Sequence, residues 1–343
     1  MRYLCAVLNC GIVFSSHHIL RSDSVEGLLR SQEALLASLP GLRPVFRRWF
    51  LSDPSQKAEI SPSGDCAEAF IVQPPLDGSA AGLWIWLVGD AEVGFEDGAT
   101  FIREGECTHI LTAGAESRAE GSERQTAAIL EDYESFLAGK GLGIGENCVR
   151  TWFFCHDIDN NYAGLVKGRR ENFLVEGLTP QTHYIASTGI AGTPVDPENL
   201  VQMDAWAIDG PFRQRYLYAP THLNPTYEYG VTFERGVTFD CGGKSTTLIS
   251  GTASINNKGE VMHIGDPVAQ TGRMLENVEA LLAEAGAAWT DVKMALVYLR
   301  NAADYAKVAP LLSEKLGATP YIILLAPVCR PDWLIEMECI AIR

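Results

Sequence analysis

Two acidic side chains stand in the apolar segment that ends the sequence, where a buried carboxyl group could transfer a proton. Glu336 and Glu338 lie two positions apart in LIEMECIAI, and alternate residues of a β-strand share a face. The neighbours Leu334, Ile335 and Met337 would shield the acids from water. Desolvation raises a carboxyl pKa, and a second carboxylate raises it further. The pattern is typical of a general acid, although an edge strand with one wet face would show the same alternation.

An earlier segment has the same pattern with different chemistry. In VQMDAWAI, Gln202 corresponds to Glu336, and an amide keeps the shape of a carboxyl group but cannot deliver a proton. Arg150 lies in the middle of a predicted strand, where the later segment has Ala295. A buried guanidinium needs a carboxylate or a ligand anion. Arg150 therefore pairs with an internal acid such as Asp157 or Asp159, or it binds an anionic ligand in an active site between the two halves.

These segments belong to a longer internal repeat. The residues QTAAILE at 125–131 recur as QTGRMLE at 270–276, and the match continues without a gap to Gly141 and Gly286. Each copy is predicted to be an amphipathic helix, because its apolar residues recur at helical spacing. Each glycine stands where a helix end needs a left-handed residue. After each helix we expect a strand, an Asp-containing turn and a second helix.

The repeat predicts an α+β fold of two units, each a mixed β-sheet with helices packed on one face. The boundary is expected near Gly210, which gives units of 1–210 and 211–343. Strands are expected at 67–72, 82–88, 230–238 and 246–253, with the last two joined by the hairpin turn DCGG. The apolar start at 1–8 is predicted to be a strand rather than a signal peptide.

Composition argues against several classes of function. The formal net charge of −16 disfavours binding to nucleic acid or to an anionic membrane. An anion can still bind in a local pocket where Arg, Lys and backbone N–H groups outnumber carboxylates. The nine cysteines are scattered and form no C-x-x-C pair, which predicts reduced thiols in a cytoplasmic protein. The seven histidines show no metal-ligand spacing, so neither a metal nor another cofactor is expected.

Several segments resemble known families. SGTA at 250–253, QT at 270–271 and IEMECIA at 335–341 resemble the RidA/YjgF family. Most of the chain more specifically resembles chorismatases, through segments in both halves. These segments are QPPLDGS at 73–79, RTW at 150–152, DIDNNY at 157–162, HYIASTGI at 183–190 and CRPDWLIE at 329–336. The resemblance implies two RidA/YjgF-like (chorismate-mutase-like) units, a diverged one before residue 210 and one with the catalytic acid after it.

The resemblance assigns a role to individual residues. It implies that Glu336 is the essential acid and that the substrate pocket is lined by Arg150, Tyr162 and Arg169, with Tyr218 as a further candidate. The arginines would clamp the two carboxylates of chorismate, because bidentate contacts fix the pose of a carboxylate. Glu336 would protonate the methylene carbon of the enolpyruvyl ether and create an oxocarbenium ion.

The fate of that cation divides the family by product. Attack by the ring hydroxyl of the substrate gives 3-hydroxybenzoate and pyruvate, whereas addition of water gives a trans-dihydroxycyclohexadiene carboxylate and pyruvate. Cys329, seven positions before Glu336, resembles the 3-hydroxybenzoate-forming type, and the hydrolytic type tends to carry Gln there. A small residue earlier in the sheet, placed at Gly236, is also implied to matter. Taken alone, Cys329 would fit a small buried hydrophobic residue.

Two other classes of function stay open. The last unit alone would suggest RidA-like hydrolysis of enamines and imines, and a metabolite-binding protein without catalysis is a third interpretation. RidA-like units commonly form trimers, so the chain is expected to be a monomer, in which fused units satisfy that surface, or a small homo-oligomer. Chorismate is the expected small-molecule partner.

Overall fold

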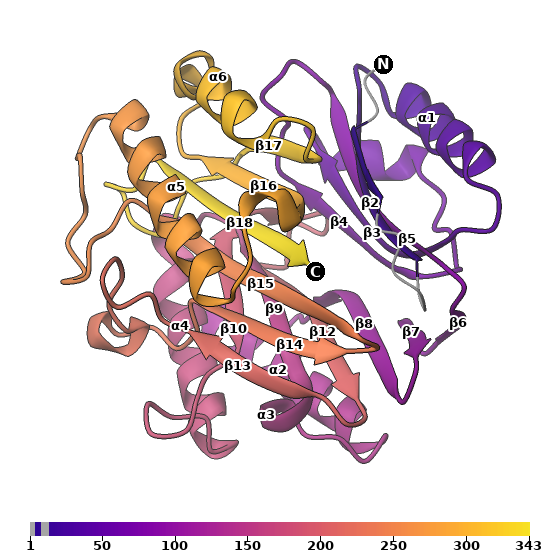
Figure 1. Cartoon of the computed structure of the whole chain (residues 1–343), viewed down its shortest axis with the longest axis horizontal. Helices are drawn as coiled ribbons and strands as arrows, with labels where there is room; N and C mark the ends of the chain where they lie inside the picture. The colour runs from indigo at the N-terminus through magenta and orange to yellow at the C-terminus, as the bar shows by residue number, and fades with distance from the viewer. Residues whose placement is uncertain (1–3, 8–13) are drawn as a thin grey trace.

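The computed structural model describes residues 4–7 and 14–343 and folds them into three six-stranded sheets (Figure 1). The first sheet contains, in spatial order, β1 (Leu4–Val7), β2 (Phe14–Ser22), β5 (Ala81–Gly89), β3 (Arg43–Leu51), β4 (Ala67–Val72) and β11 (Thr193–Pro194). The second contains β10 (Ala186–Ala191), β9 (Cys148–Cys155), β12 (Val201–Asp209), β8 (Cys107–Glu116), β7 (Ala99–Glu104) and β6 (Glu92–Glu96). The third contains β13 (Arg213–Leu217), β14 (Gly236–Cys241), β15 (Lys244–Ala253), β18 (Ile335–Ile342), β16 (Val292–Leu299) and β17 (Tyr321–Leu325).

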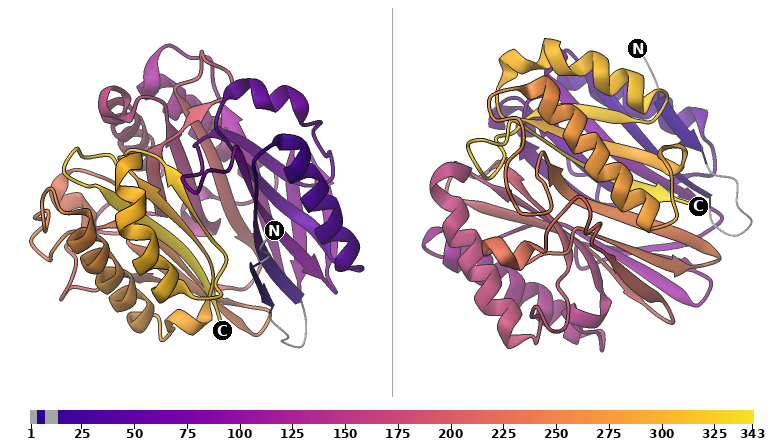
Figure 2. Two further views of the ribbon diagram at one scale, coloured as in Figure 1. Left: turned by 90° about the horizontal axis from the view of Figure 1, so that it is seen from above. Right: turned by 60° about the vertical axis from the view of Figure 1, so that its left-hand side comes forward.

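The helices lie on the outside of these sheets (Figure 2). The first sheet carries α1 (Val25–Ser38), the second carries α2 (Gly121–Ala138), α3 (Ile144–Asn147) and α4 (Ile158–Val175), and the third carries α5 (Pro267–Glu284) and α6 (Tyr305–Leu316). Short 3₁₀ turns complete the chain: η1 (Pro54–Glu59), η2 (Thr226–Tyr229), η3 (Trp289–Asp291) and η4 (Ala302–Asp304). None of the helices in the described part of the chain is long and apolar enough to cross a membrane.

The predicted α+β class is confirmed, but the sheets number three rather than two. The strands expected at 67–72 and 82–88 exist as β4 and β5, yet they belong to the first sheet, and the second sheet opens with β6 and β7. All three sheets repeat one topology, in which a parallel pair of strands is followed by antiparallel neighbours. Of the strand expected at 1–8, the structure describes β1, and the other residues lie outside the described part.

The repeat found in the sequence has a structural cause. Gly141 and Gly286 follow the repeated helices with φ of 76° and 73°, as the helix ends require. The side-chain oxygen of Gln125 accepts a hydrogen bond from the backbone N–H of Leu200 (2.6 Å), and that of Gln270 accepts one from Leu334 (2.9 Å). The repeated glutamine therefore fixes the chain where it enters β12 in one unit and β18 in the other.

The predicted hairpin is present, with its first strand shorter than expected. Gly242 and Gly243 form the turn with φ of 59° and 79°, the pair of positive values that a type I′ turn needs. The strand before the turn, β14, begins at Gly236 rather than at residue 230. Residues 230–235 are mainly an extended loop, and this loop forms part of a cavity wall.

The three sheets close into a circle with their helix-free faces inward, around a shared core that includes Trp84, Trp152 and Trp206. Buried ion pairs join two of the three interfaces. Arg48 of the first sheet donates to Asp204 of the second (Nε–Oδ2 2.8 Å), and Arg150 of the second sheet pairs with Glu338 of the third.

The third interface combines polar and apolar contacts. Arg21 of the first sheet donates to the carbonyl oxygen of Tyr321 in the third, and the backbone N–H of Leu76 donates to the carbonyl oxygen of Ile323 (3.0 Å). Gly82 of the first sheet leaves room for the side chain of Ile322 from the third sheet, which a Cβ atom on residue 82 would meet at 2.6 Å. The strand registers also correct one prediction. Phe154 lies opposite Gln202 and Tyr298 lies opposite Glu336, so four residues earlier Arg150 corresponds to Met294, and not to Ala295.

Candidate active site

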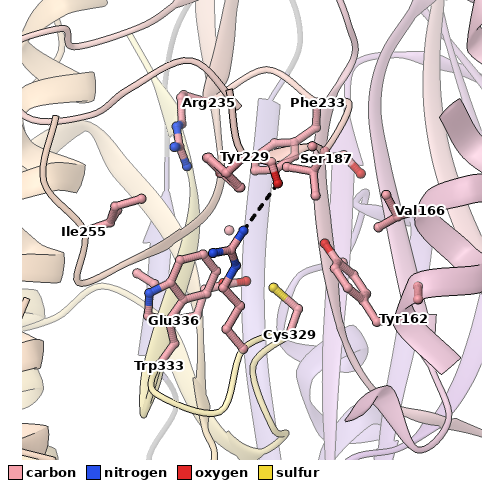
Figure 3. A pocket seen from close by; sticks show the side chains of 17 residues that line it. Tyr162, Val166, Ser187, Tyr229, Phe233, Arg235, Ile255, Cys329, Trp333 and Glu336 are labelled. Carbon is pink, nitrogen blue, oxygen red and sulfur yellow. Dashed lines mark hydrogen bonds between the residues drawn. The ribbon is translucent and has the colours of Figure 1, made fainter. Parts of the chain in front are cut away.

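A cavity of about 320 Å³ lies between the second and third sheets (Figure 3). The second sheet and its helix α4 provide one wall, and the third sheet with its loops provides the other. The lining residues of the first wall are Tyr162, Ala163, Val166, Ser187 and Gly189. Those of the second are Tyr229, Gly230, Val231, Phe233, Arg235, Gly251, Ala253, Ile255, Cys329, Arg330, Trp333 and Glu336. Aromatic and aliphatic side chains share this lining with three charged residues, Arg235, Arg330 and Glu336.

Glu336 contributes the acidic group of the cavity. Its carboxyl group lies against Gly251 of β15, where any larger side chain would collide with it. Burial raises the pKa of Glu336 to about 8, and the negative charge of Glu338 adds to the shift, while Arg235 and Arg150 oppose it. Glu336 is therefore protonated at neutral pH, as the sequence pattern predicts for a general acid.

Glu338 has a different environment although it shares a face of β18 with Glu336. Its carboxylate accepts hydrogen bonds from Trp152 (3.0 Å), Tyr298 (2.7 Å) and Thr188, and it pairs with the guanidinium of Arg150. A carboxylate with these partners is held as a buried structural anion. Glu338 therefore contributes charge to the site without facing the cavity.

Arg150 does not line the cavity. Its guanidinium is committed to Glu338 and also donates to Ser250 (3.0 Å), and burial lowers its pKa while Glu338 opposes that shift. Of the two alternatives left by the sequence, the structure shows the internal carboxylate. The acid is Glu338 of the other sheet, however, and not Asp157.

Two other guanidinium groups face the cavity. Arg235 is anchored by its Nε and Nη2 atoms to the carbonyl oxygen of Asn224 (3.1 and 2.9 Å). Its Nη1 atom meets no protein acceptor in the described part of the chain. Arg330 donates to the carbonyl oxygen of Tyr229 (3.4 Å, the dashed line in Figure 3) and lies over the Trp333 ring at 5.2 Å. Neither arginine forms an ion pair with a described carboxylate, so both can bind an anionic ligand.

Tyr162 and Arg169 both come from α4, but only Tyr162 lines the cavity. Arg169 is buried behind the wall, where it donates to Thr232 (3.2 Å) and Ser187 (3.5 Å). Its Nη2 atom has no described partner, and it pairs with no described carboxylate. Burial lowers the pKa of Arg169 and raises that of Tyr162 well above its usual value. Arg169 therefore adds positive potential behind the wall.

Cys329 lines the cavity next to Tyr162 (Figure 3). Burial raises the pKa of its thiol to about 12, and the nearby Glu336 adds to the shift. The sulfur is thus a neutral thiol and a poor nucleophile. The described cysteines with resolved side chains, 66, 107, 148, 155, 241, 329 and 339, all carry free thiols; Cys10 lies outside the described residues.

Tyr218 and Gly236 lie outside this cavity. Tyr218 is 47% exposed and lines a second cavity. Gly236 packs in β14, where a Cβ atom would meet the carbonyl oxygen of Leu248 at 2.9 Å. The glycine that makes room for the acid is Gly251.

One group of side chains in the described part of the chain has a geometry that metal ions use. Glu104, His109 and Cys241 bring their ligand atoms within 4.8 Å of one another. Lys244 already pairs with Glu104 at 2.9 Å. Trp206 donates to Nδ1 of His109 (3.2 Å), which leaves the proton of a neutral imidazole on Nε2, facing Glu104 at 3.2 Å. The lysine and this proton occupy the positions where a cation would bind.

Sequence reasoning missed the two arginines of the cavity. Arg235 stands in a segment that was expected to be a strand, where no side chain could be assigned to a pocket. Arg330 had a signal, because it follows Cys329 inside the segment that carries the family resemblance. Gly251 had one too, because it lies in the SGTA segment.

Comparisons with known proteins divide the chain into two parts. The family model of Endoribonuclease L-PSP matches residues 241–343. A RutC family protein of Pyrococcus abyssi is 41% identical over 87 residues, which are 25% of this chain and 68% of that protein. The 3-aminoacrylate deaminase RutC of Acinetobacter baylyi is 31% identical over 96 residues, 27% of this chain and 75% of that protein.

A likeness over nearly the whole chain is found in structure. A chorismatase crystal structure superposes with a TM-score of 0.73 and covers 97% of this chain and 100% of that chain, at 19% sequence identity. The arrangement of all three sheets is therefore a fold already seen in a chorismatase, the family that most of the sequence resembles.

Proposed function

This chain belongs to the RutC family, and we propose that it is a chorismatase that protonates the enolpyruvyl group of chorismate with Glu336. The observation that carries the proposal is a carboxyl group with a pKa of about 8 in a cavity that also presents two guanidinium groups without carboxylate partners. Chorismate is a dianion whose cleavage begins with a proton, so both features match it.

The local charge supports an anionic substrate in an acidic protein. With Glu336 protonated, Arg235 and Arg330 are the charged groups that line the cavity, and Arg169 lies behind its wall. Guanidinium groups donate hydrogen bonds to carboxylates, and Arg235 keeps its Nη1 group for such a contact because Asn224 holds Nε and Nη2. Arg235 and Arg330 would each hold one carboxylate, and Tyr162 and Trp333 would pack against the ring and the enolpyruvyl group.

In the proposed reaction the Glu336 proton moves to the methylene carbon of the enol ether. The resulting oxocarbenium ion forms next to a newly charged carboxylate, which stabilises it. Proton transfer of this kind contributes about 10²–10⁴-fold to the rate, and fixed orientation of the dianion supplies further acceleration.

We propose that the cation is captured by the ring hydroxyl, so that the products are 3-hydroxybenzoate and pyruvate. Cys329 and Ile255 line the same cavity as the acid and hold water poorly, which favours the internal nucleophile. Hydrolysis to the trans-dihydroxycyclohexadiene carboxylate is the alternative product on the same pathway.

The test is a product assay on chorismate. Wild-type protein should release pyruvate together with 3-hydroxybenzoate, and Glu336→Gln should lose turnover while it keeps the wild-type circular dichroism spectrum. A diol product would overturn the assignment to the 3-hydroxybenzoate-forming type and leave the assignment as a chorismatase intact. Absence of turnover by the wild type would overturn the proposed function, and an active Glu336→Gln variant would overturn the assignment of the acid.

Deaminase activity is a second candidate, favoured by the similarity of the last unit to the 3-aminoacrylate deaminase RutC. It predicts turnover of small enamines while chorismate is ignored. The cavity wall from the second sheet distinguishes the two proposals, because Tyr162→Ala should impair cleavage of a ring substrate more than hydrolysis of a three-carbon enamine.

We also propose that the chain divides functionally near residue 210. Residues 1–210 would supply Tyr162, Ser187 and Arg169, and residues 211–343 would supply the acid and the clamping arginines. Free thiols at the described cysteines are in keeping with a cytoplasmic location, which we propose as well.

A further inference from the structure

A second cavity of about 460 Å³ adjoins the candidate active site. It too lies between the second and third sheets, with residues 180–184 on one side and residues 218–227 on the other. Arg235 lines both cavities. One guanidinium-bearing residue therefore separates the candidate active site from an outer cavity that no step of the proposed reaction uses.

The outer cavity has a polar floor and an aromatic rim. Asn224, Glu234 and Arg235 form the floor and are 4%, 8% and 3% exposed. Tyr218 and Tyr227 form the rim, and each is 47% exposed. Exposed tyrosines around a cavity that ends in buried charges are suited to a ligand with a flat ring and a polar end.

The floor offers one donor group and one acceptor group. Asn224 holds the Nε and Nη2 atoms of Arg235 (3.1 and 2.9 Å) and leaves Nη1 without a described protein acceptor. One oxygen of Glu234 accepts from the backbone N–H of Tyr184 (2.8 Å). Its other oxygen accepts no hydrogen bond from a described residue. A ligand that carries both a carboxylate and a hydroxyl group would satisfy both sides of this floor.

We propose that the outer cavity is a second binding site for a hydroxylated ring carboxylic acid, held by Arg235 and Glu234 between Tyr218 and Tyr227. The choice of 3-hydroxybenzoate as the ligand rests on the proposed function. The shared arginine places this site on a path by which an acid passes between solvent and the catalytic cavity.

The experiment measures binding of 3-hydroxybenzoate by calorimetry to a protein whose catalytic cavity is filled. Cys329→Trp removes space from the inner cavity alone. The variant should still bind 3-hydroxybenzoate in the outer cavity. Adding Tyr218→Ala and Tyr227→Ala should weaken that binding about tenfold, equivalent to ~1.4 kcal/mol. Both tyrosines are half-exposed, and an unchanged melting temperature will show that the variant folds.

Benzoate provides the matched ligand control. Because it lacks the hydroxyl that Glu234 accepts, it should bind Cys329→Trp less tightly than 3-hydroxybenzoate. Loss of all binding in Cys329→Trp, equal binding of the rim variant, or equal binding of benzoate would each overturn the proposal. The assay needs no turnover, so failure of chorismate cleavage with binding retained would remove the proposed function and leave the second site.

Discussion

At the scale of residues, the site depends on two carboxyl groups with opposite environments on one face of one strand. Glu338 is surrounded by donors and pairs with Arg150, whereas Glu336 is buried without such partners at the cavity wall and has a pKa of about 8. Burial is the main cause of the raised pKa of Glu336, and the negative charge of Glu338 adds to it. One position separates the two residues, so both side chains lie on the same face of β18.

The raised pKa of Glu336 predicts the pH dependence of the reaction. The acid must be protonated, so kcat/KM should be constant toward neutral pH and fall as pH rises through about 8. The same shift affects stability, because ionising Glu336 is costly in the folded protein. Wild type should lose stability relative to Glu336→Gln between the usual glutamate pKa and about 8. A pH–rate profile and melting curves will check both, and an alkaline limb well below pH 8 would contradict the assignment.

Glu338→Gln tests the coupling between the acids. It removes the negative charge that raises the pKa of Glu336 and leaves Arg150 without a counter-charge. The alkaline limb of the pH–rate profile should therefore move to lower pH. The free energy of unfolding should fall by about 3 kcal/mol, as expected when one partner of a buried ion pair is removed. A lower melting temperature with an unmoved pH profile would show a purely structural role.

At the scale of elements, helices position the cavity walls through hydrogen bonds to the backbone just before a strand begins. Gln270 of α5 accepts from Leu334 N–H and donates to the Asp332 carbonyl oxygen (2.8 Å). Those residues lie between Arg330 and Glu336, so α5 sets where the acid and the clamping arginine sit relative to each other. Gln125 does the same for β12, away from the cavity.

The two glutamines therefore form a matched pair of substitutions. Gln270→Ala and Gln125→Ala should each cost about 1–3 kcal/mol, since each leaves buried backbone groups without partners. Only Gln270→Ala should lower kcat/KM, by about tenfold or more, because it displaces catalytic groups. Equal losses of activity in both variants would indicate that stability, rather than position, controls turnover.

The sequence allowed prediction of those elements whose signals are local. Helical periodicity and the Gly242–Gly243 turn are contained in short segments, and α2, α5 and the β14–β15 hairpin were predicted from them. The first sheet was not recognised as a separate unit, although its strands β4 and β5 were predicted. Its residues lack the repeated QT motif and have η1 in place of a second long helix. The partner of Arg150 was missed because Glu338 lies 188 positions away, and Arg235 because its wall is an irregular loop.

At the scale of the whole molecule, three sheets of one topology surround one core, and cross-sheet ion pairs hold two of the interfaces. Arg48 with Asp204 and Arg150 with Glu338 are contacts within one chain. Surfaces that three separate RidA-like subunits would bury between them are thus buried internally. We therefore expect a monomer, and sedimentation equilibrium should give the mass of a single chain over a wide range of concentrations. A trimer would contradict this expectation.

The presence of Met294 in the third sheet at the position that Arg150 occupies in the second has a consequence for how this site could arise. In an assembly of identical subunits every substitution is made three times, so a residue that opens one interface opens all of them. When the units are fused into one chain, a substitution can change one interface without changing the other two. One interface could become a catalytic cavity with a free acid, while Gln202 and Gly82 kept the other two interfaces closed. The two closed interfaces would offset the loss of stability caused by the open cavity.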